Sequence, residues 1–412
     1  MPTIVDYPEV VKKGVKAFES LFENAPERKH LAEYLTGLII AEHKSVSGIN
    51  REFVQTTDQS CLNRWITEVD WDPRKLNDRR LGELQKDSRT GYSHRGVIAL
   101  DNTLIDHDGK TIEDVGYFWD HAEKRNIIAH DYLISNCVTP AGYHYPIEFR
   151  RFRKEATVEA ENKENPKSKA VFKNHTELAI ELLDDAIDRE IPGDFTFDSY
   201  FTNAEVLNHL EEKKRNYVGD LKQNRKVVFQ GQEMKASEMT ALIPVEDRKS
   251  FQRGEQTQWY FTVTIRIPKV EHKVRILFIW DRKNGKEPVK VLISNRTNWE
   301  ATRMLLVYRS RWTGTETFHR DAKQQLGMGD CQLLSGQGHD RHMYLVFTAY
   351  SLLVRTLGST HPNEWARKKL KTIGEACRAV RAETLEGLVD WIVEKFSVEH
   401  WSPAQIKLSV AI

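Results

Sequence analysis

The chain has 412 residues, of which 40% are hydrophobic and 10% aromatic, so it can form two or three globular domains and is not a disordered tail. Its 61 Lys and Arg residues nearly cancel its 60 Asp and Glu residues, which excludes a global electrostatic attraction to nucleic acid and requires any basic surface to be local. Four cysteines lie far apart without a C-x-x-C pair, which argues against a zinc ribbon or disulfide framework and fits a reducing compartment.

The sequence shows neither a signal peptide nor an apolar run long enough to span a membrane. The segment Met1-Pro-Thr-Ile lacks the basic and apolar blocks of a signal peptide, so none is expected. The longest apolar run, from Met343 to Val354, is shorter than the ~18–20 residues of a membrane span. We therefore expect a buried helix there and no membrane partner.

The amino-terminal region, residues 1–90, has the periodicity of helices. The apolar residues that recur on one helix face are Leu62, Trp65, Ile66 and Val69. With the periodic segment 31–53, this helix could form a helix-turn-helix unit that binds DNA. An ordinary helical bundle is the alternative, and the pattern alone favours it.

Two short apolar strands, each followed by an acid, come next. Gly96-Val-Ile-Ala-Leu ends at Asp101, and a second strand ends Phe-Thr-Phe before Asp198. Further strands are predicted near 126–137, 143–153 and 217–221, and helices near 170–188 and 203–214. Acids at the ends of buried strands lie where open α/β sheets place their sites.

The pattern changes at residue 225. From 225 to 294 apolar residues recur with period two, which predicts an antiparallel β insertion within a mixed α/β domain. After Ser294 the chain is predicted to be helical to its end. Glu316, Arg320 and Lys323 then lie at i, i+4 and i+7, on one helix face.

Three acids stand out by context: Asp101, Asp198 and Glu316. Three converging carboxylates are tolerable only beside a divalent cation, and oxygen ligands without His or Cys favour Mg²⁺ or Mn²⁺. Each acid also has a simpler interpretation. Thr313-Gly-Thr-Glu316 matches a capping box, Asp198 could cap a helix, and Asp101 could open a turn. Likewise, Glu316 with Arg320 and Lys323 could be a surface salt-bridge ladder.

The run Y308-x-x-R311-W312, E316-x6-K323-x-x-L326-G327 resembles the Tyr-Arg-Glu-Lys motif of bacterial insertion-sequence transposases of the DDE class. The block L100-D101-N102-T103 is similar to the family's first-Asp block, and F197-D198-S199-Y200-F201 to its second. The segment N295-R296-T297-N298-W299 stands where the family's β insertion returns to the core. The three blocks in this order are specific to the family.

One departure concerns the arginine. The family usually places three residues between Arg and Glu, whereas four separate Arg311 from Glu316. Either Arg311 is not the motif arginine, or a local insertion at 313–315 shifts it. The Glu-x6-Lys spacing is kept.

The resemblance implies an α/β fold: an RNase H-like mixed sheet with an antiparallel β insertion, plus helical terminal regions. The expected domains are 1–90 (helical, DNA-binding), 91–326 (catalytic, with the insertion at 225–294) and 327–412 (helical). It also implies metal-dependent cleavage at transposon ends and transfer of the 3′-OH into target DNA. A bacterial cytoplasmic, nucleoid-associated location follows.

The resemblance also implies residue roles. Asp101, Asp198 and Glu316 are expected to be catalytic and to bind Mg²⁺, with Mn²⁺ as a substitute. The residues expected to contact DNA are Tyr308, Arg311, Lys323, Arg320 and Trp299, together with Arg151 and Arg153 of a local basic cluster. Trp299 is the candidate for stacking on a displaced base.

The expected partners are double-stranded DNA, as terminal inverted repeats and as target, and a second copy of the chain in the DNA complex. Two alternatives remain open from the sequence. One is a non-catalytic, domesticated transposase that only binds DNA. The other is an RNase H-like nuclease that cuts without strand transfer.

Overall fold

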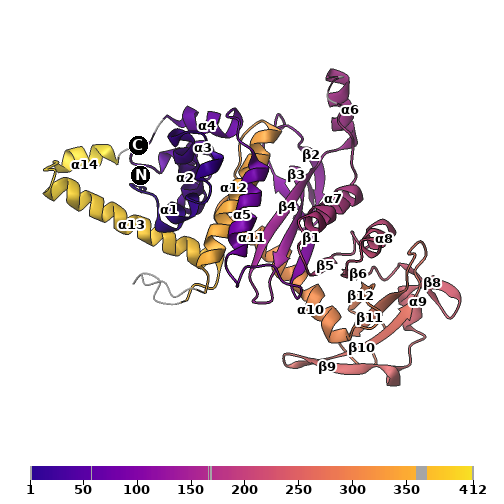
Figure 1. Cartoon of the computed structure of the whole chain (residues 1–412). Coiled ribbons are helices and arrows are strands. Elements are labelled where there is room, and N and C mark those ends of the chain that lie inside the picture. Colours follow the sequence, from indigo (N-terminus) through magenta and orange to yellow (C-terminus); the bar gives the residue numbers. More distant parts are fainter. Residues whose placement is uncertain (1, 57, 166, 168, 359–368, 411–412) are drawn as a thin grey trace. The chain divides into compact units, whose positions relative to one another are not determined.

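The computed structural model of the chain describes all residues except 1, 57, 166, 168, 359–368 and 411–412 (Figure 1). The strands are β1 (Val97–Asp106), β2 (Gly116–Asp120), β3 (Arg125–Val138), β4 (His144–Phe152), β5 (Asp194–Phe197), β6 (Tyr217–Asp220), β7 (Lys226–Phe229), β8 (Gln232–Lys235), β9 (Lys249–Arg253), β10 (Gln256–Ile265), β11 (Val274–Trp280) and β12 (Lys290–Ser294).

Helices occupy both terminal regions and the connections between core strands. They are α1 (Glu9–Val15), α2 (Ala25–Ile40), α3 (Val46–Arg51), α4 (Gln59–Thr67), α5 (Pro73–Gln85), α6 (Glu155–Glu164), α7 (His175–Asp188), α8 (Ala204–Glu212), α9 (Ala236–Thr240), α10 (Ala301–Trp312), α11 (Phe318–Leu326), α12 (Gly336–Thr356), α13 (Ile373–Ser397) and α14 (Pro403–Ser409). A π-helical turn, Thr313–Thr317, separates α10 from α11.

Ten strands form one mixed sheet in the order β2-β3-β1-β5-β6-β12-β11-β10-β9, and β4 also pairs with β3. Strands β1, β5 and β6 are parallel neighbours. The order β4-β3-β1-β5-β6 is that of an RNase H-like core, so the predicted fold class is confirmed. The predicted insertion supplies β9 to β12, which extend this sheet because β12 pairs with β6.

The register of β5 on β1 begins at a glycine. Gly193 has φ +114°, and a Cβ there would lie 2.4 Å from the carbonyl oxygen of Gly96. Only glycine accommodates both the left-handed backbone and this close approach. The pairing that follows sets Val97 opposite Asp194 and Leu100 opposite Phe197.

The chain forms two compact units. The first comprises residues 1–91, 104–130 and 318–412, and the second comprises 92–103 and 131–317. Within the first, α12 packs against α2 and α5, so the amino- and carboxy-terminal helices share one core. The proposed three-domain division at residues 90 and 326 stays a prediction.

The helix face identified at 62–69 is a packing face. Leu62, Trp65 and Ile66 are buried, and Trp65 stacks on Trp71 with ring centroids 5.2 Å apart. The Arg341 guanidinium of α12 lies 4.8 Å from the Trp71 ring centroid and donates to the Ile66 carbonyl. Helix α4 ends at Thr67, so the predicted fourth position, Val69, lies beyond it. This arrangement matches the bundle alternative.

Among the described residues, no helix combines the length and apolarity needed to cross a membrane. The run from Met343 to Val354 belongs to α12, whose residues there are buried, as predicted.

Candidate active site

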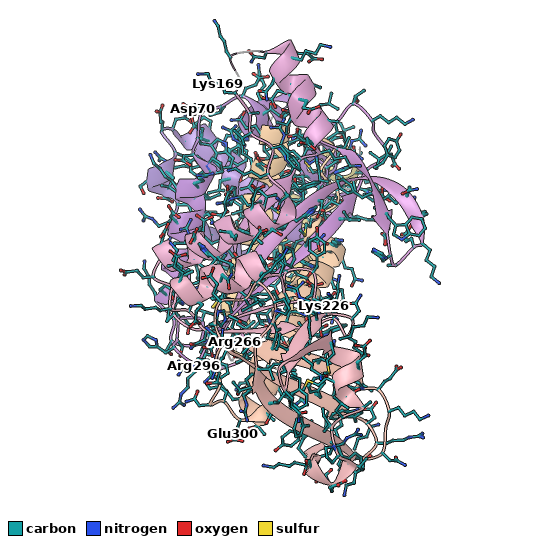
Figure 2. The ribbon with its side chains drawn as sticks, turned by 90° about the vertical axis from the view of Figure 1, so that its right-hand side faces the viewer. Asp70, Lys169, Lys226, Arg266, Arg296 and Glu300 are labelled. Atoms are coloured by element: carbon teal, nitrogen blue, oxygen red, sulfur yellow. The ribbon has the colours of Figure 1, made fainter. Side chains whose placement is uncertain are left out.

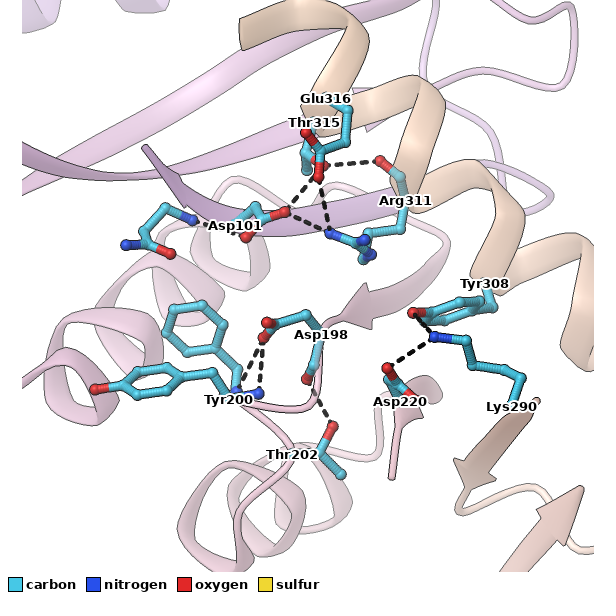
Figure 3. Close-up of polar contacts among 12 residues, drawn as sticks. Asp101, Asp198, Tyr200, Thr202, Asp220, Lys290, Tyr308, Arg311, Thr315 and Glu316 are labelled. Atoms are coloured by element: carbon cyan, nitrogen blue, oxygen red, sulfur yellow. Dashed lines mark hydrogen bonds and ion pairs between the residues drawn. The ribbon is translucent and has the colours of Figure 1, made fainter. Parts of the chain in front are cut away.

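Two of the three predicted acids lie on neighbouring elements: Asp101 is in β1, and Asp198 directly follows its parallel neighbour β5 (Figure 3). The last registered pair of β1 and β5 is Leu100 with Phe197, so Asp101 and Asp198 follow at the same level. Because side chains alternate along a strand, residues at one level of parallel neighbours share a face. One prediction needs correction: β1 does not end at Asp101 but runs to Asp106. Pairing with β5, rather than the strand, is what ends there.

Asp101 is 9% exposed, and two side chains contact its carboxylate, one from the end of α10 and one from the π-helical turn. Arg311 Nη1 donates to Asp101 Oδ2 over 2.5 Å, and Thr315 Oγ1 lies 3.2 Å from the same oxygen. Burial raises the pKa of Asp101 to about 7; Arg311 opposes this, and the negative charges of Asp198 and Glu316 add to it. The carboxylate is therefore costly to ionise without a further cation.

Asp198 begins the turn after β5. Its Oδ1 accepts the backbone N–H groups of Tyr200 (2.9 Å) and Phe201 (3.3 Å), which fixes the carboxylate in place. The cap of the next helix, α8, is Asn203, so the helix-cap interpretation of Asp198 does not apply.

Glu316 lies in the π-helical turn, and this turn accounts for the unusual Arg–Glu spacing. In an α-helix, residues five apart point about 140° away from each other. A π turn holds one extra residue per turn and returns residue i+5 to the face of residue i. Glu316 Oε1 accordingly lies 3.8 Å from Arg311 Nη1, which favours the local-insertion explanation. The capping-box alternative fails, because Thr313 is helical and no helix begins there.

A glycine lets this turn approach the sheet. A Cβ at Gly314 would lie 2.7 Å from Val138 Cγ2 and 3.0 Å from Ala99 Cβ. Both neighbours belong to the strands beneath, β3 and β1. The glycine thus sets the depth of the π turn over β1 and with it the position of Glu316.

Tyr308 lies one turn before Arg311 and is flanked by cations. Lys290 Nζ lies 5.3 Å and Arg311 Cζ 5.8 Å from its ring centroid. Lys290 also forms an ion pair of 3.0 Å with Asp220. Sequence reasoning missed Asp220 and Lys290, although Asp220 ends a buried strand as Asp198 nearly does.

A second network, also missed, supports the residue after Asp101. Asn102 Nδ2 donates to Asp131 Oδ1 over 3.1 Å, and the other oxygen of Asp131 lies 2.7 Å from His175 Nε2. Asp131 is buried, and the His175 ring stacks on Phe152 at 3.9 Å. The network joins β1, β3 and α7. Asp131 and His175 lie inside segments with no distinguishing motif, so the sequence offered no signal for them.

The contacts given for Trp299, Arg320 and Lys323 are with residues other than the three acids. Trp299 is half-buried against the core, with the Arg303 guanidinium 5.1 Å from its ring centroid. Arg320 is exposed and pairs with Asp321 at 3.0 Å. Lys323 Nζ donates to the Leu104 carbonyl over 2.8 Å.

The basic cluster at the end of β4 is largely compensated by acids. Arg153 forms an ion pair with Glu161 of α6, and Arg150 forms one of 3.0 Å with Glu181 of α7. Arg151 is half-buried on β4. By contrast, Arg266 and Arg296 are exposed and have no ion-pair partner among the residues that the structure describes (Figure 2).

The donor set of the acid trio (Asp101, Asp198 and Glu316) fits a divalent cation. All donors are carboxylate oxygens, the ligands that Mg²⁺ and Mn²⁺ prefer. Burial is the main cause of the raised pKa of Asp101, and the negative charges of Asp198 and Glu316 add to it. Arg311 supplies one positive charge to the trio, and a divalent ion would supply the balance.

Two family models match the chain. Residues 17–251, more than half of the chain, match the family described as DDE superfamily endonuclease. Residues 173–352 match the transposase DDE domain, and the two matches together include all three acids. No curated protein is significantly similar in sequence. Members of these families cleave DNA with divalent metals, and the chain belongs to the DDE superfamily of endonucleases, as a transposase of the insertion-sequence type.

Proposed function

We propose that this chain is a cut-and-paste transposase that cleaves DNA at transposon ends and joins the freed 3′-OH to target DNA. The observation that carries the proposal is the placement of Asp101 and Asp198 at one level of β1 and β5, with Arg311 within 3.8 Å of the Glu316 carboxylate. Such a trio can hold the two divalent ions used for in-line displacement at a phosphodiester.

In this scheme Asp101, Asp198 and Glu316 would hold Mg²⁺, which would supply Lewis acidity at the scissile phosphate. The side chains of the site position the cation and the phosphate. Asp198, fixed by two backbone N–H groups, and Asp101 orient the cation site. Arg311 and Lys290 present positive charge beside Tyr308, where a phosphate oxygen would be stabilised.

We propose that the residues predicted from the sequence contact DNA. The structural support differs from residue to residue. Tyr308 and Arg311 are supported by their position beside the acids. Exposed Arg320 and half-buried Trp299 are supported by accessibility, and Lys323 by its place on the motif helix α11. Arg151 and Arg153 are proposed to track phosphates, although DNA must compete with Glu161 for Arg153. We add Arg266 and Arg296, which carry exposed positive charge (Figure 2).

We also propose a homodimer in the DNA complex. Helix α13 presents four apolar side chains on one face, each more than half exposed: Leu385, Val389, Val393 and Phe396. A second copy of the helix would bury this stripe. Light scattering with and without end DNA tests it. A Val389→Lys variant should stay monomeric under conditions where wild type with DNA is dimeric.

The test of function uses duplex DNA carrying the repeats that flank the reading frame, incubated with Mg²⁺ or with EDTA. Wild type should nick the ends in Mg²⁺ alone and produce joined products with target plasmid. Asp198→Asn should bind the same DNA without cutting it, whereas the exposed-site control Asp247→Asn should cut normally. Normal cutting by Asp198→Asn contradicts the assignment. Cutting without joined products would instead identify a nuclease.

A further inference from the structure

Away from the acid trio, three buried histidines meet inside the first compact unit. They are His107, just after β1, His130 of β3, and His339 in the first turn of α12. One nitrogen from each lies within 4.8 Å of the others, and the side chains are 8%, 0% and 3% exposed. They belong to none of the motifs discussed above.

Hydrogen bonds fix which nitrogens carry protons. His130 Nε2 lies 2.8 Å from the Glu113 carbonyl, and His339 Nε2 lies 2.7 Å from the Leu333 carbonyl. A carbonyl only accepts, so both Nε2 atoms must donate, and both Nδ1 atoms keep their lone pairs. Metal-binding histidines are typically oriented by such a bond from the other ring nitrogen to a carbonyl.

The two segments that supply these carbonyls are also hydrogen-bonded to each other. Glu113 N donates to the Leu334 carbonyl over 2.9 Å, and Gly336 N donates to Glu113 Oε2 over 2.7 Å. The loop after β1 and the start of α12 therefore hold the two rings as one rigid frame. His107 completes the frame: its Nε2 lies 2.9 Å from His130 Nδ1 and donates a hydrogen bond to it. A metal bound between these two nitrogens would replace that proton.

Burial favours the neutral form of two of the three rings. Burial, with the neighbouring histidines, lowers the pKa of His339 to about 2, and burial lowers the pKa of His107. Asp106 and Asp108 oppose this shift of the His107 pKa, but burial is the larger effect. A neutral imidazole is the form that binds a transition metal.

We propose that His107, His130 and His339 form a structural site for a transition-metal dication, with Zn²⁺ the best match. Tetrahedral zinc holds nitrogens at about 2.0–2.1 Å, which sets them roughly 3.4 Å apart. The present separations, from 2.9 Å to at most 4.8 Å, bracket that value. Imidazole selects zinc, cobalt or copper over magnesium, so this site is chemically distinct from the carboxylates.

One of the three histidines borders a cavity. His107 lines an open cavity of roughly 490 Å³ together with His43, Asp106 and Asp108. The two aspartates place negative charge beside His107 and would attract a cation. In the proposed site, water from this cavity would be the fourth ligand. The bound metal would fasten the start of α12 to β1 and β3 within the same compact unit.

The test is a Co²⁺ titration of the full-length protein in excess Mg²⁺, which occupies the carboxylates. Wild type should bind one equivalent with the visible absorption of tetrahedral Co²⁺, and Zn²⁺ should bleach it. His107→Asn and His339→Asn should each weaken Co²⁺ binding at least tenfold. The control His43→Asn, an exposed histidine of the same cavity, should bind as wild type does.

Thermal unfolding gives a readout that needs no variant. Zn²⁺ should raise the unfolding temperature of metal-stripped wild type by several degrees, because it binds only the folded state. The proposal is overturned if wild type shows neither the absorption nor the stabilisation. Equal Co²⁺ affinity in His107→Asn, His339→Asn and wild type would overturn it as well.

Discussion

Replacing Asp101 with Asn should stabilise the metal-free protein at neutral and alkaline pH. The pKa of Asp101 is about 7 in the folded chain, against 3.8 for an ordinary Asp. The folded state therefore binds this proton more tightly than the unfolded state, and wild type loses stability as pH rises from about 4 to about 7. Each pH unit in that window costs about 1.4 kcal/mol, for a total of roughly 4 kcal/mol above pH 7. An amide at position 101 cannot ionise and avoids this loss.

The assay is urea unfolding of wild type and Asp101→Asn in EDTA between pH 5 and pH 8. The advantage of the variant should be about 3 kcal/mol larger at pH 8 than at pH 5. Adding Mn²⁺ at pH 8 should stabilise wild type and leave the variant nearly unchanged. The cation stabilises the folded state by binding the ionised Asp101 carboxylate, which the variant lacks. A difference in stability that is constant with pH refutes the reasoning.

Three further outcomes follow from the site. Gly314→Ala should lower stability by about 1–3 kcal/mol and reduce DNA cleavage at least tenfold, because its Cβ meets the strands beneath; the control Gly82→Ala, with open space around it, should be neutral or slightly stabilising. Deleting Thr313 should convert the π turn to α-helix, restore the family's Arg–Glu spacing and keep cleavage; loss of cleavage in a folded deletion protein would argue against the bulge explanation. Lys290→Met should weaken binding of end DNA and make it less sensitive to salt, while Tyr308→Phe, which keeps the ring between the two cations, should change binding less; equal effects would contradict the cation–ring arrangement.

The sequence predicted the parts of the fold that depend on local pattern. Apolar runs located β1, β5 and the period-two strands β10 to β12. The family blocks predicted the acid trio, and its catalytic role stays a prediction. What pattern could not supply was pairing. Nothing in the residues 225–294 indicates that β12 pairs with β6 and so extends the core sheet, because that pairing is a long-range choice. Nor could periodicity show that α12 packs among the amino-terminal helices.

The same limit applies at the site. The spacing of Arg311 and Glu316 was seen as an irregularity, but only the observed π turn explains how the pair stays together. Asp131, His175 and the three clustered histidines each come from segments distant in sequence. A lone Asp or His carries no signal of its neighbours, so these residues become visible only when strands and helices bring them together.

The most direct test of the central claim is a crystal of the wild-type protein with end DNA, soaked in Mn²⁺ and measured at the manganese edge. We predict an anomalous peak about 2.0–2.3 Å from carboxylate oxygens of both Asp101 and Asp198, with Glu316 completing the site. A map with no peak there, and with the three carboxylates beyond ligation distance of a common point, would contradict the account.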